Sequence, residues 1–251
     1  GEPFDFVITS KFDIIWTLQE IGNQFYTEKA VHELANIMPQ FSASEVFTPK
    51  QLIFAFVWMT LSVAALTLWP INSIIALNLA ISVFLLLNFA LRMVLTWVGG
   101  DQYFDNLVTD EEVNAIDERT LPVYSILLPM YHESATLPHI AQALRSLDYP
   151  LSKLDIKLIL EQDDDETIET AKDLGLEGIF EIIRVPESFP RTKPKACNYA
   201  LHFCRGELAT IYDGEDAPEP DQLKKVVIAF QKAPKNTAVI QARLNYFNVA
   251  E

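Results

Sequence analysis

The chain has 251 residues, 50% of them hydrophobic, and carries 34 acidic against 19 basic side chains, a formal net charge of −15. This length allows one or two domains with enough chain to bury a core. The acidic balance argues against a nucleic-acid binder, because binding to phosphate requires a basic face. Cys197 and Cys204 are too few for a disulfide scaffold, so we expect reduced thiols inside the cell.

Residues 1–49 predict a small helical N-terminal segment. Apolar side chains recur at helical spacing within residues 12–21, and Gly22 lies near the expected end of this first helix. A second helix is predicted over residues 27–38, where a threonine begins an amphipathic stretch that Pro39 ends.

The stretch from Gln51 to Val98 contains one charged side chain, Arg92. Its apolar runs, 52–69 and about 74–97, are each long enough to span a hydrocarbon core of about 30 Å. The short connection between them has no Lys or Arg, which favours both ends in the cytoplasm. Residues 50–98 therefore predict two transmembrane helices of a multi-pass inner-membrane protein with a cytoplasmic domain; two buried core helices are the alternative.

Residues 99–120 are acidic and are interpreted as a linker or a solvated helix.

From residue 121 onward, strands and helices are predicted to alternate. The predicted strands are 123–129, 155–161, 180–185, 208–213 and 238–244, and the predicted helices are 137–147, 166–174, 195–204 and 221–230. This alternation predicts an α/β fold with a parallel sheet, and such sheets bind ligands beyond the carboxyl ends of their strands.

Charged side chains gather where two of these strands are predicted to end. Clustered carboxylates need a compensating cation, and their oxygens favour Mg²⁺, Mn²⁺ or Ca²⁺. Lysines and a helix N-terminus nearby suit a metal-bound diphosphate. A solvated acidic loop remains the alternative for the first cluster. The residues are Glu161, Asp163, Asp164 and Asp165; Asp213, Glu215 and Asp216; and, between them, Arg191, Lys193, Lys195 and Asn198.

Four segments in this order resemble the nucleotide-sugar half of family 2 glycosyltransferases: VYSILLPMYHES, LEQDDDET, TKPKACNYAL and IYDGEDAPEPDQL. They are most similar to the membrane-bound cellulose synthase, hyaluronan synthase and related bacterial polysaccharide synthases. The resemblance covers about residues 121–251 and implies a Rossmann-like nucleotide-diphospho-sugar transferase domain of the GT-A type. Residues 1–49 have a lesser resemblance to the end of the N-terminal domain of type II secretion ATPases.

The resemblance implies a nucleotide-sugar site at the ends of the first two strands. The end of the first strand, including Pro129, Tyr131 and Glu133, would line the nucleotide pocket. Asp163 and Asp164 match the paired aspartates that contact uracil and ribose.

The resemblance also implies a metal and its ligands. Lys195 matches a lysine near the nucleotide, and Asp213 begins the D-x-D motif that holds Mg²⁺ or Mn²⁺ on the diphosphate. Glu215 stands at the second acidic position of that motif and Asp216 follows it, so the second metal ligand stays open between them.

Family members carry their general base, a further aspartate, in a T-E-D-like motif well beyond D-x-D, followed by a Q-x-x-R-W motif and more transmembrane helices. None of these appears before Glu251. We therefore expect an incomplete transferase domain, a piece of a longer enzyme that is inactive alone, with its catalytic base beyond Glu251.

The leading hypothesis is a membrane-embedded, metal-dependent inverting glycosyltransferase. It would transfer a hexose from a cytosolic nucleotide sugar, a UDP-sugar, to a growing polysaccharide or a lipid. The alternative is a membrane-anchored nucleotide-binding or regulatory module without transferase activity. A metal-dependent phosphohydrolase is a third hypothesis.

Overall fold

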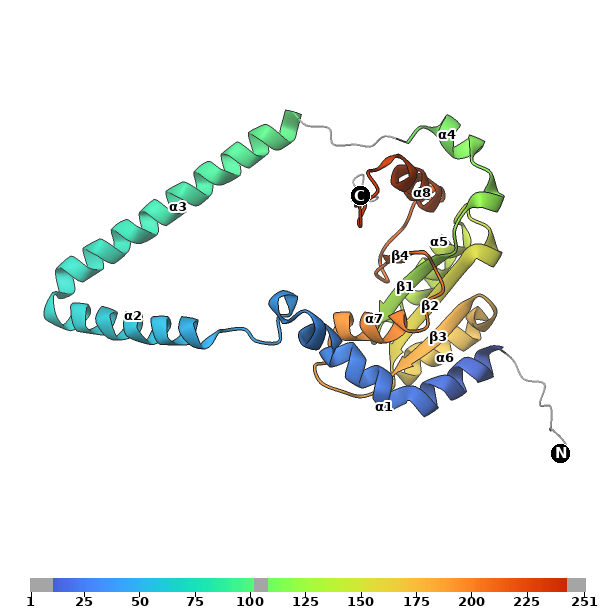
Figure 1. The fold of residues 1–251 in the computed structure, drawn as a ribbon, viewed down its shortest axis with the longest axis horizontal. Coiled ribbons are helices and arrows are strands. Elements are labelled where there is room, and N and C mark those ends of the chain that lie inside the picture. The colour runs from blue at the N-terminus through green and yellow to red at the C-terminus, as the bar shows by residue number, and fades with distance from the viewer. Residues whose placement is uncertain (1–10, 102–107, 243–251) are drawn as a thin grey trace. The chain divides into compact units, whose positions relative to one another are not determined.

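The structure is a computed structural model that describes residues 11–101 and 108–242. The described residues form two compact units (Figure 1): residues 11–37 with 108–242, and residues 38–101. The first unit is an α/β domain with one additional N-terminal helix. The second consists of a short 3₁₀ turn and two long helices.

A parallel four-stranded sheet forms the centre of the first unit, with strand order β3-β2-β1-β4. This confirms the predicted α/β fold. The strands are β1 (Tyr124–Met130), β2 (Leu154–Glu161), β3 (Phe180–Val185) and β4 (Leu208–Ile211). The helices that follow them are α5 (Leu137–Arg145), α6 (Asp165–Asp173), α7 (Lys193–Leu201) and α8 (Gln222–Lys232).

Both faces of the sheet are covered, because successive side chains of a strand point to opposite faces. On one face, residues such as Ile126 and Leu158 pack with side chains of α5, α6 and α8. On the other face, Leu127 and Ile159 pack with α7 and with the N-terminal helix α1. Burial on both faces explains why these strands are continuous apolar runs.

The buried Lys157 interrupts the apolar run of β2. Its ammonium lies 3.0 Å from Asp155 Oδ1 and 2.6 Å from Glu181 Oε1. Asp155 also accepts a hydrogen bond from Ser125 and pairs with the Arg205 guanidinium. Burial opposes ionisation of Asp155, but the hydrogen bonds and the Lys157 charge outweigh it and lower the pKa of this carboxyl. The buried lysine is thus fully compensated by carboxylates.

The acidic segment before the sheet is tied to α8 rather than free in solvent. Its helix α4 (Asp110–Ala115) begins with a capping box formed by Thr109 and Glu112. Glu112 pairs with Lys232 at 2.6 Å, and Glu118 pairs with Lys224 at 3.0 Å.

The described residues also form short 3₁₀ helices. These are Pro39–Phe41, Glu118–Thr120, Leu151–Lys153 and Leu176–Gly178.

The N-terminal segment forms one helix, α1 (Lys11–Ile37), so the prediction of two helices was wrong. Gly22 lies inside α1, where the ring of Tyr26 occupies the space that a Cβ atom would need. Tyr26 in turn packs edge-on against Tyr199 and Phe203 near α7, with ring centroids 6.2 and 5.0 Å apart. Tertiary packing against α7 thus keeps the helix continuous across the glycine.

α1 also covers β3, which lies at the edge of the sheet. The Gln19 side chain accepts a hydrogen bond from the Arg184 backbone N–H at 3.0 Å and donates to the Ile182 carbonyl at 3.5 Å. The side-chain amide therefore takes the place of a neighbouring strand's peptide group. This contact protects an edge that would otherwise present unpaired backbone groups.

The predicted strand over residues 238–244 is not formed in the part that the structure describes, residues 238–242. Ala238, Val239 and Ile240 instead line a small groove beside β4 and α8. β4 is four residues long, and among the described residues it pairs only with β1. β4 therefore offers only a short outer edge to which a fifth strand could pair. Residues 243 and 244 lie outside the described residues.

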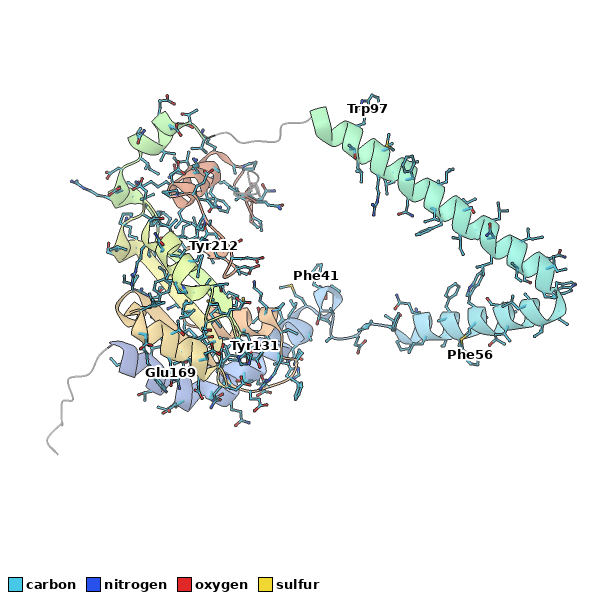
Figure 2. The ribbon with its side chains drawn as sticks, turned by 180° about the vertical axis from the view of Figure 1, so that it is seen from behind. Phe41, Phe56, Trp97, Tyr131, Glu169 and Tyr212 are labelled. Atoms are coloured by element: carbon cyan, nitrogen blue, oxygen red, sulfur yellow. The ribbon has the colours of Figure 1, made fainter. Side chains whose placement is uncertain are left out.

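The second unit contains α2 (Pro49–Leu68) and α3 (Pro70–Asp101). Thr48 and Gln51 form a capping box at the start of α2, and Pro70 occupies the first position of α3, where proline is tolerated. Figure 2 shows side chains, including Phe56 and Trp97, around these helices. By length and composition, α2 and residues Pro70–Val98 of α3 are able to cross a membrane.

We predict that Gln19→Met opens the edge of β3. The substitution keeps the side-chain length but leaves the Arg184 N–H without its acceptor, which costs about 1–3 kcal/mol. Hydrogen exchange followed by mass spectrometry should show faster exchange of the peptide containing Arg184. Glu20→Met, at the exposed neighbouring position, is the matched control and should leave the exchange rate of this peptide unchanged. Unchanged protection in Gln19→Met would contradict the role of this amide.

Candidate nucleotide-sugar site

A cavity of about 450 Å³ lies at the carboxyl ends of the strands. The strand order reverses at β1, since β2 and β3 lie on one side of it and β4 on the other. Parallel sheets bind ligands in the crevice at such a reversal. The predicted site residues that line the cavity are Pro129, Tyr131, Glu133, Asp213 and Glu215; those that do not line it are Asp163, Asp164, Lys195 and Asp216.

A buried ion pair joins Glu161, which lines the cavity at the end of β2, to Lys195 in the first turn of α7. Lys195 Nζ lies 2.9 and 3.1 Å from the two carboxylate oxygens of Glu161. Both side chains are buried, so neither is available as a free charge. In the sequence, Glu161 is one member of an acidic cluster, and its pairing with Lys195 could not be predicted across 33 intervening positions. Its place as the last residue of a buried strand was the available signal.

Arg191 connects three polar groups at the rim of the cavity. Its guanidinium lies 3.0 Å from Asp163 Oδ2 and 3.4 Å from the Tyr131 hydroxyl, and 2.9 Å from Glu187 on its other side. Desolvation disfavours the charged form of Asp163, but the hydrogen bond from Arg191 outweighs it and lowers the pKa of Asp163. Tyr131, labelled in Figure 2, lies in the segment after β1, and its ring is part-exposed.

The neighbouring Asp164 has a different position, with no exposed surface. One oxygen accepts a hydrogen bond from the Thr167 N–H at 3.2 Å and so caps α6. The other accepts from the His132 N–H at 2.7 Å. His132 has a φ of 54°, in the left-handed region that non-glycine residues seldom adopt. Asp164 therefore holds the segment after β1 in shape, whereas Asp163 faces solvent.

The segment after β4 lies close to the segment after β1. The approach is close at Gly214, where a Cβ atom would lie 2.7 Å from Thr136 Oγ1 and 2.8 Å from Glu133 Oε2, so a larger residue would require these side chains to move. The Asp213 N–H donates to Asp216 Oδ2 at 2.7 Å, so the Asp216 carboxylate is used within its own turn. Asp213 and Glu215 face the cavity, and Asp213 is paired there with Lys193.

The donor set at this edge suits a hard divalent cation. Within residues 11–101 and 108–242, no three His, Cys, Asp or Glu side chains converge as a preformed metal cage. Mg²⁺ in phosphate-binding sites is commonly held by one or two carboxylates together with substrate phosphates and water. Asp213 and Glu215, which both line the cavity, provide two such carboxylates.

The two cysteines belong to the packing of the domain. Both are free thiols, Cys197 buried in α7 and Cys204 half-buried just beyond it. Burial raises the pKa of both thiols, which disfavours the reactive thiolate.

Comparisons with known proteins agree with this fold. The model of the family described as glycosyl transferase family 2 matches residues 125–250. Among curated proteins, the chain is 23% identical over 124 residues to the probable glycosyltransferase YdaM of Bacillus subtilis, aligning 49% of this chain with 30% of that protein. It is 26% identical over 133 residues to a beta-monoglucosyldiacylglycerol synthase of Trichormus variabilis, aligning 53% of this chain with 28% of that protein.

The solved structures that resemble the chain include a mannosyltransferase of Pyrobaculum calidifontis in complex with GDP-Man and Mn²⁺. It is 22% identical with a TM-score of 0.45, and the match covers 57% of this chain and 40% of that one. S. aureus TarS in complex with UDP-GlcNAc is 18% identical with a TM-score of 0.38, covering 43% and 31%. The chain thus spans about a third of the length of the curated relatives it matches.

We predict that the adjacent aspartates differ in their effect on stability. Asp164→Ala removes the acceptor for two backbone N–H groups and should lower the free energy of unfolding by about 1–3 kcal/mol. Asp163→Ala, at an exposed position, is the matched control and should leave the midpoint of thermal unfolding unchanged. Both are measured by thermal unfolding in detergent. Equal midpoints for the two variants would contradict the structural role of Asp164.

Proposed function

This chain belongs to glycosyl transferase family 2, and we propose that it is the donor-binding part of a membrane-embedded inverting hexosyltransferase that uses a nucleotide sugar. One observation carries the proposal. The cavity has carboxylates after β4 on one side and the basic residues Arg191 and Lys193 on the other, which is the charge arrangement that a metal-bound diphosphate requires.

The nucleoside would lie at the end of β2 and the sugar diphosphate nearer β4. Tyr131 and the Asp163–Arg191 pair form a polar rim with an aromatic ring, which suits a base such as uracil. The buried Asp164 would hold this rim in place by accepting the hydrogen bond from the His132 N–H. Pro129 and Glu133 complete the wall towards the β4 segment.

Transfer leaves negative charge on the departing nucleoside diphosphate. Mg²⁺ or Mn²⁺ held by Asp213 with Glu215 or Asp216 would neutralise part of that charge when bound. Lys193, at the start of α7, would donate to the phosphate oxygens, where the helix N-terminus also favours an anion. Lys195 would keep this turn of α7 in place through its buried pair with Glu161. We propose that a base beyond Glu251 deprotonates the acceptor hydroxyl.

We propose a multi-pass inner-membrane location with the transferase domain in the cytoplasm. Both α2 and residues Pro70–Val98 of α3 are long and apolar enough to span a bilayer. The acceptor would be a lipid or a polysaccharide, as in the membrane-bound bacterial polysaccharide synthases. The name of the Trichormus relative describes a glucosylated diacylglycerol product, which favours a lipid acceptor.

The proposal is tested by calorimetric titration of UDP into the detergent-solubilised chain with Mn²⁺ present. We expect saturable, Mn²⁺-dependent binding that Asp213→Ala abolishes, because this carboxylate would hold the metal on the diphosphate. Asp173→Ala, an equal loss of charge at an exposed position at the end of α6, is the matched control and should bind as wild type does. Undiminished binding by Asp213→Ala would reject the metal site. Failure of the folded wild-type chain to bind UDP would reject the donor site.

A second prediction distinguishes the two candidate metal ligands. Glu215→Gln should weaken Mn²⁺-dependent UDP binding by about 3- to 10-fold, because one charged oxygen donor to the metal is lost. Asp216→Asn should change it little, since the amide oxygen can still accept the Asp213 N–H. The same titration measures both variants. The reverse ranking would assign Asp216 as the second ligand.

A further inference from the structure

Lys193 occupies a position where it competes with the expected metal. Its ammonium is in direct contact with Asp213 Oδ1, on the carboxylate proposed above to hold the ion. The side chains of Lys193 and Asp213 are 45% and 53% exposed, so each can reach the open cavity without unfolding of its surroundings. Both residues line the cavity.

The backbones on the two sides of this contact are held in place independently of it. On the α7 side, Lys195 is paired with Glu161 at 2.9 Å, and Asn198 donates to the Ala30 carbonyl of α1 at 3.2 Å. On the β4 side, the N–H of Asp213 itself is bonded to Asp216. The Lys193 side chain, with its flexible four-carbon stem, is therefore the part that can move.

The other basic residues of this segment have fixed partners. Lys195 is buried with both oxygens of Glu161, and Arg191 is held between Asp163 and Glu187. Lys193 alone among these three is paired with the carboxylate that a metal needs. A divalent ion on Asp213 would repel the ammonium, whereas the oxygens of a diphosphate would attract it.

We propose that Lys193 is an exchange residue: it neutralises Asp213 when no metal is bound and moves to the diphosphate when metal and nucleotide bind together. The inference rests on the proposed function and adds a coupling between its two ligands. With metal alone, Lys193 would lose its carboxylate partner and have no anion to move to, whereas with nucleotide also bound the diphosphate would be that anion. Each ligand therefore strengthens the binding of the other by the same factor.

The test is a titration of Mn²⁺ into the detergent-solubilised chain, with free Mn²⁺ measured by electron paramagnetic resonance, without and with UDP. Lys193→Met should bind Mn²⁺ alone about 2- to 5-fold more tightly than wild type, because Asp213 is no longer neutralised. With Mn²⁺ present, it should bind UDP about 10-fold more weakly, because a charged donor to phosphate is lost. Opposite changes in the two affinities are the signature of exchange.

Two controls isolate the effect of this side chain. Lys172→Met removes the same charge at an exposed position on α6 that does not line the cavity, and it should change neither affinity. Lys193→Arg keeps the positive charge and should retain weak binding of Mn²⁺ alone. Thermal unfolding of each variant verifies that it is folded.

The outcomes separate this inference from the proposed function. If UDP does not promote Mn²⁺ binding in wild type, the donor site itself is rejected and the exchange with it. If wild type shows the coupling but Lys193→Met binds Mn²⁺ alone no more tightly, the donor site stands and the exchange is rejected. A parallel loss of both affinities in folded Lys193→Met would show that Lys193 supports the site without exchanging.

Discussion

The buried ion pair between Glu161 and Lys195 is the interaction on which the geometry of the cavity depends. It joins the end of β2 to the first turn of α7, and both side chains are almost completely removed from water. Removing charges from water costs several kcal/mol per ion, so either partner alone would be unstable there. The pair therefore fixes α7 against the sheet, and it places Lys193, two residues earlier, within reach of the segment after β4.

The N-terminal helix is part of the same arrangement. α1 covers the edge of β3 through Gln19 and packs against the back of α7 through Tyr26. The helix that carries the basic residues is thus held from both sides, by the sheet and by a segment more than 150 positions earlier in the chain. The rigidity of α7 leaves the exposed side chains at its start as the elements able to respond to a ligand.

Charge neutralisation explains how an acidic chain can provide a site for an anion. Arg191, Lys193 and Lys195 each meet a carboxylate from the end of β2 or β4. These pairs offset the repulsion between the carboxylates. The pair of Lys193 is half-exposed and can open towards a ligand, whereas Arg191 is held between two carboxylates and the pair of Lys195 is buried.

The sequence by itself determined the α/β architecture, the order of its elements from β1 to α8 and the edge of the sheet at which the candidate site lies. Apolar runs and helical spacing are local patterns, and parallel strands have their carboxyl ends at one edge of the sheet, so the acidic ends of β2 and β4 had to lie at the same edge. Only the tertiary structure separated Asp163 from Asp164, because adjacent residues differ in burial only through what packs on them. It also decided the single N-terminal helix across Gly22 and the unformed strand over residues 238–242, since both depend on partners distant in the chain. The tertiary structure also decided which carboxylate each basic residue pairs with, because ion pairs between residues far apart in the chain cannot be predicted from local spacing.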